Sequence, residues 1–98
     1  MSDDSNDFAP PAFRPESALQ QLRRSLRELR PLAERGNSYL LQGHKILELN
    51  HDEHTINARI AKRPTASTNW DSAVCRSSAD VRKLLDDIKL RLTRWTDE

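Results

Sequence analysis

Three histidines, His44, His51 and His54, lie close together in a stretch that we expect to be helical. Spacings of seven and three residues place them on one helical face. Histidine is the commonest metal ligand in proteins, and a zinc site needs three or four ligands. Asp52 and Glu53 point to other faces of such a helix, and the run HDEH lacks the spacing of zinc proteases. We therefore favour solvated or hydrogen-bonded histidines, and keep a metal-binding or pH-responsive module as an alternative.

The single cysteine, Cys75, is the other side chain suited to nucleophilic chemistry. It follows Val74 in a stretch that we expect to be helical, without the glycine-bearing turn that exposes a nucleophile. One thiol excludes an internal disulfide and a cysteine-based metal cluster, and it is typical of a reducing compartment. We therefore predict a protein that is not an enzyme, that needs no cofactor and that is cytoplasmic.

Four arginines flank a leucine repeat near the N-terminus: Arg23, Arg24, Arg27 and Arg30. Guanidinium groups clasp phosphates, but they also pair with carboxylates such as Glu28 and Glu34. The net charge of the chain is +1, well below the clustered basicity of a dedicated nucleic-acid-binding domain. A nucleic-acid-binding accessory function therefore ranks behind protein binding.

Leucines at helical spacing predict the protein-binding surface. Leu19, Leu22, Leu26 and Leu29 are separated by three, four and three residues, as in a heptad seam. Tryptophan is enriched at interface hot spots, and Trp95 lies close to the C-terminus. The predicted partner-binding residues are Leu19, Leu22, Leu26, Leu29, Leu40, Leu92 and Trp95.

Three helices are expected to position these residues, near 16–30 (or to 35), 38–62 and 69–95. The middle one carries two apolar stripes and needs cover on both sides. One stripe holds Ile46, Leu49, Ile56 and Ile60, and the opposite one holds Leu40, Leu47, Ala58 and Ala61. We find no alternation typical of strands. Two points stay open: whether residues 50–55 are helix or loop, and whether the last helix starts afresh at Ser77, which Asp80 can help to cap.

Residues 1–15 predict a disordered tail that is acidic and proline-rich, and it holds the only two phenylalanines of the protein, Phe8 and Phe13. We favour loose packing of one phenylalanine on the domain over a linear docking motif. We expect no signal peptide, because the N-terminal residues are acidic and lack an apolar stretch, and no membrane span, because no apolar run is long enough. At 36% hydrophobic and 32% charged residues the core is thin, which favours oligomerisation.

The sequence thus predicts an all-α, three-helix bundle-like domain over residues 16–98, homodimeric and preceded by the tail. The predicted function is that of a small regulatory protein. It binds another protein, for example a transcriptional or signalling regulator, through amphipathic helices and blocks or modulates its assembly. Neither a membrane nor, in the favoured reading, a nucleic acid is an expected partner.

Overall fold

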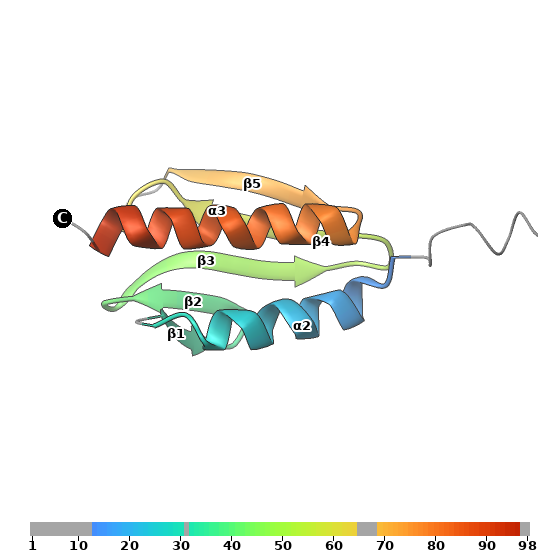
Figure 1. The fold of residues 1–98 in the computed structure, drawn as a ribbon, viewed down its shortest axis with the longest axis horizontal. Helices are drawn as coiled ribbons and strands as arrows, with labels where there is room; N and C mark the ends of the chain where they lie inside the picture. Colours follow the sequence, from blue (N-terminus) through green and yellow to red (C-terminus); the bar gives the residue numbers. More distant parts are fainter. Residues whose placement is uncertain (1–12, 31, 65–68, 97–98) are drawn as a thin grey trace, which may run out of the picture.

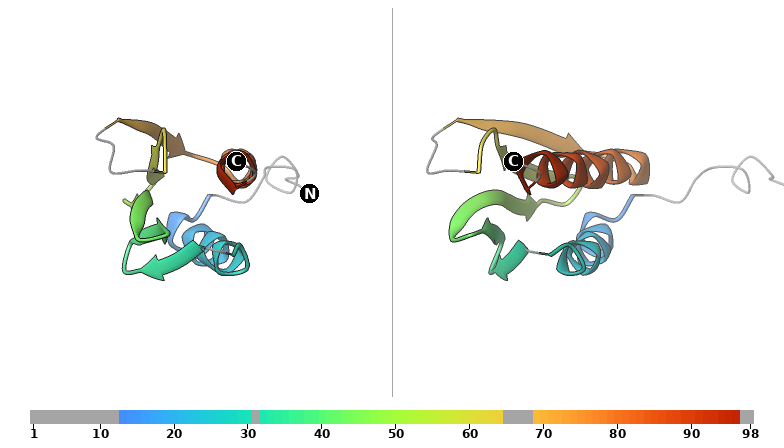
Figure 2. Two further views of the ribbon diagram at one scale, coloured as in Figure 1. Left: turned by 90° about the vertical axis from the view of Figure 1, so that its left-hand side faces the viewer. Right: turned by 60° about the vertical axis from the view of Figure 1, so that its left-hand side comes forward.

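The computed structural model describes residues 13–30, 32–64 and 69–96. Along the chain its elements are α2 (Pro15–Arg27), β1 (Leu32–Arg35), β2 (Ser38–Leu41), β3 (His44–His51), β4 (Ile56–Ala61), β5 (Trp70–Cys75) and α3 (Ser78–Thr96). The strands form one antiparallel sheet in the order β1-β2-β3-β4-β5 (Figure 1). Both helices lie on the same face of this sheet, which gives two layers (Figure 2). The fold is α+β, so the prediction of an all-α three-helix bundle is wrong.

The stretch predicted as the middle helix forms β2, β3 and β4 instead. In β4 the side chains of Ile56, Ala58 and Ile60 are buried, whereas the intervening Asn57 and Arg59 are exposed. Alternation with a period of two is the pattern of a strand with one covered face. Except for Leu40, which is half-buried between two buried neighbours in β2, the residues of both apolar stripes are buried in one core that neighbouring strands share.

A β-bulge explains why the alternation in β3 is hard to recognise. The register between β2 and β3 shifts between Tyr39 and Leu40. As a result Ile46 and Leu47, which follow each other in the sequence, are both buried. A bulge inserts one extra residue and lets two neighbouring side chains lie on the same face. The turn before this bulge uses Gln42 and Gly43, which both adopt positive φ, as a two-residue hairpin turn of type I′ requires.

The polar stretch at residues 50–55 contains the turn between β3 and β4, which answers the question that the sequence left open. The Asp52 carboxylate accepts hydrogen bonds from the backbone N–H groups of His54 and Thr55, at 2.8 and 2.7 Å. These bonds to the charged form lower the pKa of Asp52. Aspartate at the start of a turn commonly ties down the following backbone in this way.

The core lies between the sheet and the two helices, which run side by side in the same direction (Figure 1). Helix α2 contributes Leu19, Leu22 and Leu26, and the sheet contributes most of the other buried side chains. Burying a leucine stabilises the folded state by roughly 1.5–3 kcal/mol relative to leaving it exposed. The remaining buried apolar residues are Tyr39, Leu41, Ile46, Leu47, Leu49, Ile56, Ala58, Ile60, Ala61, Cys75, Leu84, Ile88 and Leu92.

Helix α3 begins where the sequence allowed a fresh start. The Asp80 backbone N–H donates to Ser77 Oγ at 3.2 Å, and the Asp80 carboxylate accepts from the Arg76 N–H at 3.0 Å. The reciprocal bonds satisfy N–H groups at the helix start, as capping residues do. The first part of the predicted last helix, from Trp70 to Cys75, is strand β5.

The predicted tail falls partly outside the described residues. Residues 1–12, with Phe8, lie outside them, whereas Phe13 is partly buried and packs against the core. Helix α2 begins at Pro15, a residue suited to the first helical turn. Among the described residues, neither helix has the length and apolar character needed to cross a membrane.

Candidate functional site: a groove between α2 and β3

The three histidines do not meet. His44 and His51 are the first and last residues of β3, which puts them about 24 Å apart at ~3.4 Å per residue. His54 follows in the turn after His51. Within the described part of the chain, no group of three histidine, cysteine, aspartate or glutamate side chains is placed to hold a metal ion. The helical face on which the metal alternative depended does not exist.

Cys75 and His51 lie on the same row across the sheet but not in contact. Each is paired with Ile56, from the strands on its two sides. Two strand spacings separate them by about 9.6 Å, which is too far for a hydrogen bond between thiol and imidazole. Burial also raises the pKa of the Cys75 thiol, so it stays protonated at neutral pH.

Most of the predicted partner-binding leucines belong to the core of this chain. Leu19, Leu22, Leu26 and Leu92 have exposed fractions of 6% or less. Leu29, Leu40 and Trp95 are half-buried and keep some surface. The leucine seam on α2 therefore packs on the sheet of its own chain, and its buried leucines are not available to a partner.

Two of the four predicted arginines are held by one carboxylate. Arg27 Nε lies 2.9 Å from Glu34 Oε1, and Arg23 Nη1 lies 3.7 Å from Glu34 Oε2. The hydroxyl of the buried Tyr39 donates to the same carboxylate at 2.9 Å. This network joins α2 to the β1–β2 hairpin. Arg24 and Arg30 are exposed.

The network shifts the pKa of two of its members. The hydrogen bond from Arg27 lowers the pKa of the Glu34 carboxyl, and burial raises the pKa of the Tyr39 hydroxyl. A carboxyl whose folded-state pKa is depressed adds stability above its unfolded pKa of about 4.3 and loses it as the pH falls. Glu34 is therefore one source of acid sensitivity.

Replacing Glu34 with glutamine is expected to reduce the stability at pH 7, where the native carboxylate is charged and paired. Between about pH 5 and pH 2 the variant should lose less stability than the native protein, because this proton-linked contribution is missing. Urea unfolding at a series of pH values measures both effects. Glu28→Gln makes the same change of charge outside the network and should follow the native profile. Parallel profiles for the native protein and Glu34→Gln would contradict this assignment.

A groove of about 550 Å³, which we call the α2–β3 groove, runs between helix α2 and the end of strand β3. Polar side chains from both elements line most of it, with two leucines at its base. Its lining residues are Glu16, Leu19, Gln20, Arg23, Arg27, Asn37, Leu49, Asn50 and His51.

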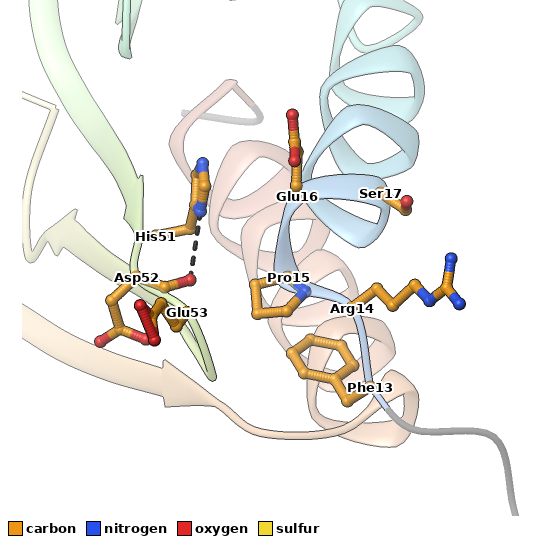
Figure 3. A pocket seen from close by; sticks show the side chains of 8 residues that line it. All are labelled: Phe13, Arg14, Pro15, Glu16, Ser17, His51, Asp52 and Glu53. Atoms are coloured by element: carbon orange, nitrogen blue, oxygen red, sulfur yellow. Dashed lines mark hydrogen bonds between the residues drawn. The ribbon is translucent and has the colours of Figure 1, made fainter.

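A second hollow of about 610 Å³ adjoins the groove and shares Glu16 and His51 with it. Figure 3 shows this hollow, with Phe13 and Pro15 on the side of the helix and the turn after β3 opposite. The two hollows together extend along the sheet-side edge of α2. We call the second hollow the mouth of the groove.

The backbone of β3 is open along the α2–β3 groove. Strand β2 begins at Ser38, opposite Glu48, and the next N–H, that of Leu49, donates to the Asn37 carbonyl at 2.9 Å. Backbone groups in a strand point alternately to its two sides, so the N–H and C=O of His51 point the same way as those of Leu49. No described strand lies alongside His51 on that side. The groove therefore has an unpaired strand end as its wall.

No pattern in the sequence indicates the amide side chains of the groove. Arg23 Nη2 donates to Asn37 Oδ1 at 2.7 Å, and Asn37 Nδ2 donates to Asn50 Oδ1 at 3.1 Å. These bonds hold the base of the groove between the β1–β2 turn, β3 and α2. Asparagine after glycine signals a turn in the sequence, but nothing in the sequence indicates that the Gly36-Asn37 turn faces α2.

The chain matches no protein-family model, no curated protein and no solved structure.

Proposed function

We propose that this protein is a small, non-enzymatic regulatory module that holds an extended segment of another protein in the α2–β3 groove. By masking that segment it would block or modulate the partner's assembly. The observation that carries the proposal is the open backbone of β3 at His51, which faces a polar groove roofed by a helix.

Strand addition is the binding mode that fits this wall. An extended peptide that pairs with a free strand end gains affinity from its main chain, and its alternate side chains enter neighbouring pockets. Here the main-chain partners are the N–H and C=O of His51 and the C=O of Leu49. Side chains of the bound segment would reach Gln20 on one side and the mouth of the groove on the other.

The charges at the mouth favour a basic segment there. Glu16 and Glu53 are both exposed and line the mouth, and the side chain of Arg14, which also lines it, points away from the hollow (Figure 3). The arginines at the other end of the groove already contact Glu34. A lysine or arginine in the partner would meet unlike charge at the mouth. Surface charges of this kind guide orientation and association rate more than affinity.

A cytoplasmic location is part of the proposal. The free thiol of Cys75 and the absence of any other cysteine fit a reducing compartment. Regulators that mask a segment of a partner need no cofactor, and none enters this scheme.

Selection of peptides from a random display library against the folded protein tests the proposal. We expect the selected peptides to shift the backbone amide NMR signals of Leu49, Asn50 and His51. Gln20→Trp fills the groove and should weaken binding by at least about tenfold, or roughly 1.4 kcal/mol. Lys89→Trp adds the same indole to an exposed position on α3 and should bind like the native protein.

Three results would count against the groove. The library could yield no binder, the selected peptides could shift signals elsewhere, or Gln20→Trp could bind as tightly as Lys89→Trp. Each of these would overturn the assignment of the α2–β3 groove as the binding site.

A further inference from the structure

Strand β5 is the outer strand on the side of the sheet away from the α2–β3 groove (Figure 1). It pairs with β4 along one side, and no described strand pairs with its other side. Native proteins blunt such edges with proline, with lysine or with very short strands. Strand β5 has six residues and contains neither proline nor lysine, and its one charged residue, Asp71, is paired with Arg91 of α3. Its edge is therefore open to pairing.

The direction of the open backbone groups follows from one hydrogen bond. The Lys62 N–H donates to the Asn69 carbonyl at 3.2 Å, so Asn69 faces β4, and every second residue after it does too. Trp70, Ser72 and Val74 therefore direct their backbone N–H and C=O groups outward.

The side chains of these three residues lie on the face of the sheet that the helices leave uncovered. Asp71, the next residue along, points to the helices, because its carboxylate meets Arg91 of α3 at 2.9 Å. Alternation then puts Trp70, Ser72 and Val74 on the other face. On that face the Arg59 guanidinium lies 5.3 Å from the centre of the Trp70 ring.

One exposed apolar side chain lies on the open strand itself. Val74 and Leu90 are the large hydrophobic residues that the described chain leaves exposed, at 42% and 56%. Val74 lies near the end of β5 on the uncovered face, whereas Leu90 belongs to α3, on the face that the helices cover. The open backbone edge of β5 thus coincides with one exposed apolar side chain, that of Val74.

We propose that two copies of this chain pair through β5, antiparallel and about a two-fold axis at Ser72. The sheets of the two copies then continue into one another. In this register Trp70 of each copy lies opposite the partner's Val74, and the two Ser72 hydroxyls lie opposite each other. Asp71 lies opposite the partner's Ala73. Every outward backbone N–H and C=O of the three residues finds a partner.

The neighbouring registers are less favourable. An axis at Asp71 sets two carboxylates directly opposite each other, and like charges in that position are destabilising. An axis at Ala73 sets Trp70 opposite the partner's Arg76 and Val74 opposite Ser72. Among the three registers, the one centred on Ser72 covers Val74 with an aromatic ring in both copies.

A second copy fits this edge because the pattern is self-complementary. A two-fold interface uses the same patch on both chains, so the patch must be complementary to itself: if residue i contacts residue j of the partner, residue j contacts residue i. The net charge of +1 per chain opposes association only weakly. The axis also makes the α3 helices of the two copies antiparallel. The acidic first turn of one α3, with Asp80, is then on the same side as the basic last turn of the other, with Arg94. The α2–β3 groove stays open, so this inference does not depend on the proposed function.

Sedimentation equilibrium on the native protein and two variants tests the interface. We expect a dimer at micromolar concentration for the native protein. Val74→Lys should raise the dimer dissociation constant at least about tenfold, because lysine at an open edge opposes pairing. Asn57→Lys places the same charge on the adjacent strand β4, opposite Val74, and should leave the dimer intact. Circular dichroism of each variant checks that it is folded.

Cysteine cross-linking tests the register independently of these variants. In a Cys75→Ala background, Ser72→Cys places two thiols across the axis, with Cα atoms about 5.5 Å apart, within the range for a disulfide. Mild oxidation should link this variant into a covalent dimer. Val74→Cys, whose copies lie far from each other in this register, should not become linked. A native protein that is still monomeric at about 100 µM, where a dissociation constant in the micromolar range gives mainly dimer, would overturn the proposal. So would a Val74→Lys dimer of unchanged affinity or efficient linkage through position 74.

Discussion

Replacing Leu26 with alanine is expected to lower the free energy of unfolding by about 2–5 kcal/mol. Leu26 has no exposed surface and lies on the face of α2 that covers the sheet. Its loss removes buried apolar contacts and leaves a cavity that the surrounding strands cannot fill. A domain of this size has a total stability of roughly 5–10 kcal/mol, so the variant should be close to unfolding at 37 °C.

Urea denaturation followed by circular dichroism measures this change. Arg24→Ala, an exposed change on the same helix, should alter the stability by no more than about 0.5 kcal/mol. Equal stability of Leu26→Ala and Arg24→Ala would mean that α2 does not cover the core.

Replacing Ala58 with proline is expected to abolish cooperative folding. Ala58 lies in β4, an inner strand, and the register directs its N–H to β5. Proline removes that donor and its ring crowds the neighbouring strand, so it is almost never found in the middle of a sheet. The expected spectrum is that of an unfolded chain, with collapsed dispersion of the amide NMR signals.

Ser72→Pro is the matched control for this change. The N–H of Ser72 points away from β4, so no bond within the sheet of one chain is lost. Proline is tolerated at edge positions of this kind. We expect Ser72→Pro to keep a cooperative unfolding transition. If both variants unfolded equally, the assignment of β5 as the edge strand would be wrong.

The two helices could be predicted from the sequence because their signals are local. Leu19, Leu22 and Leu26 recur at helical spacing, and all three are buried on one face of α2. The cap at Ser77 and Asp80 is likewise formed within one turn of chain. Spacing and capping depend on residues a few positions apart, so for these two helices the signal can be read without knowing the rest of the fold.

The strands could not be predicted because a helical period fits the same residues. Ile46, Leu49, Ile56 and Ile60 fall on one side of a helical projection, although in the fold they occupy two strands. The bulge at Ile46 and Leu47 breaks the alternation that would have revealed β3. Short apolar runs are ambiguous between helix and strand when periodicity is the only signal.

The α2–β3 groove depends on residues that no local pattern connects. Gln20, Asn37 and His51 come from a helix, a turn and a strand end, and only the ending of β2 before His51 leaves room between them. Of the three histidines that the sequence indicated as candidate metal ligands, His51 lines this groove. It does so as part of an open strand end and not as a metal ligand on a helix. Loop and strand ends are set by tertiary packing, which composition does not encode.

The order of the sheet also shapes how the chain reaches this structure. Each strand pairs with the one before it, so most of the sheet closes through short loops that cost little chain entropy. The packing of α2 beside α3 joins the beginning of the described chain to its end. Low sequence separation between contacting residues is associated with fast folding. Because its strands pair with their neighbours in the sequence, this sheet needs no long-range strand pairing. In β-sandwiches and barrels such pairing slows folding and leaves strands unpaired for longer, which favours aggregation.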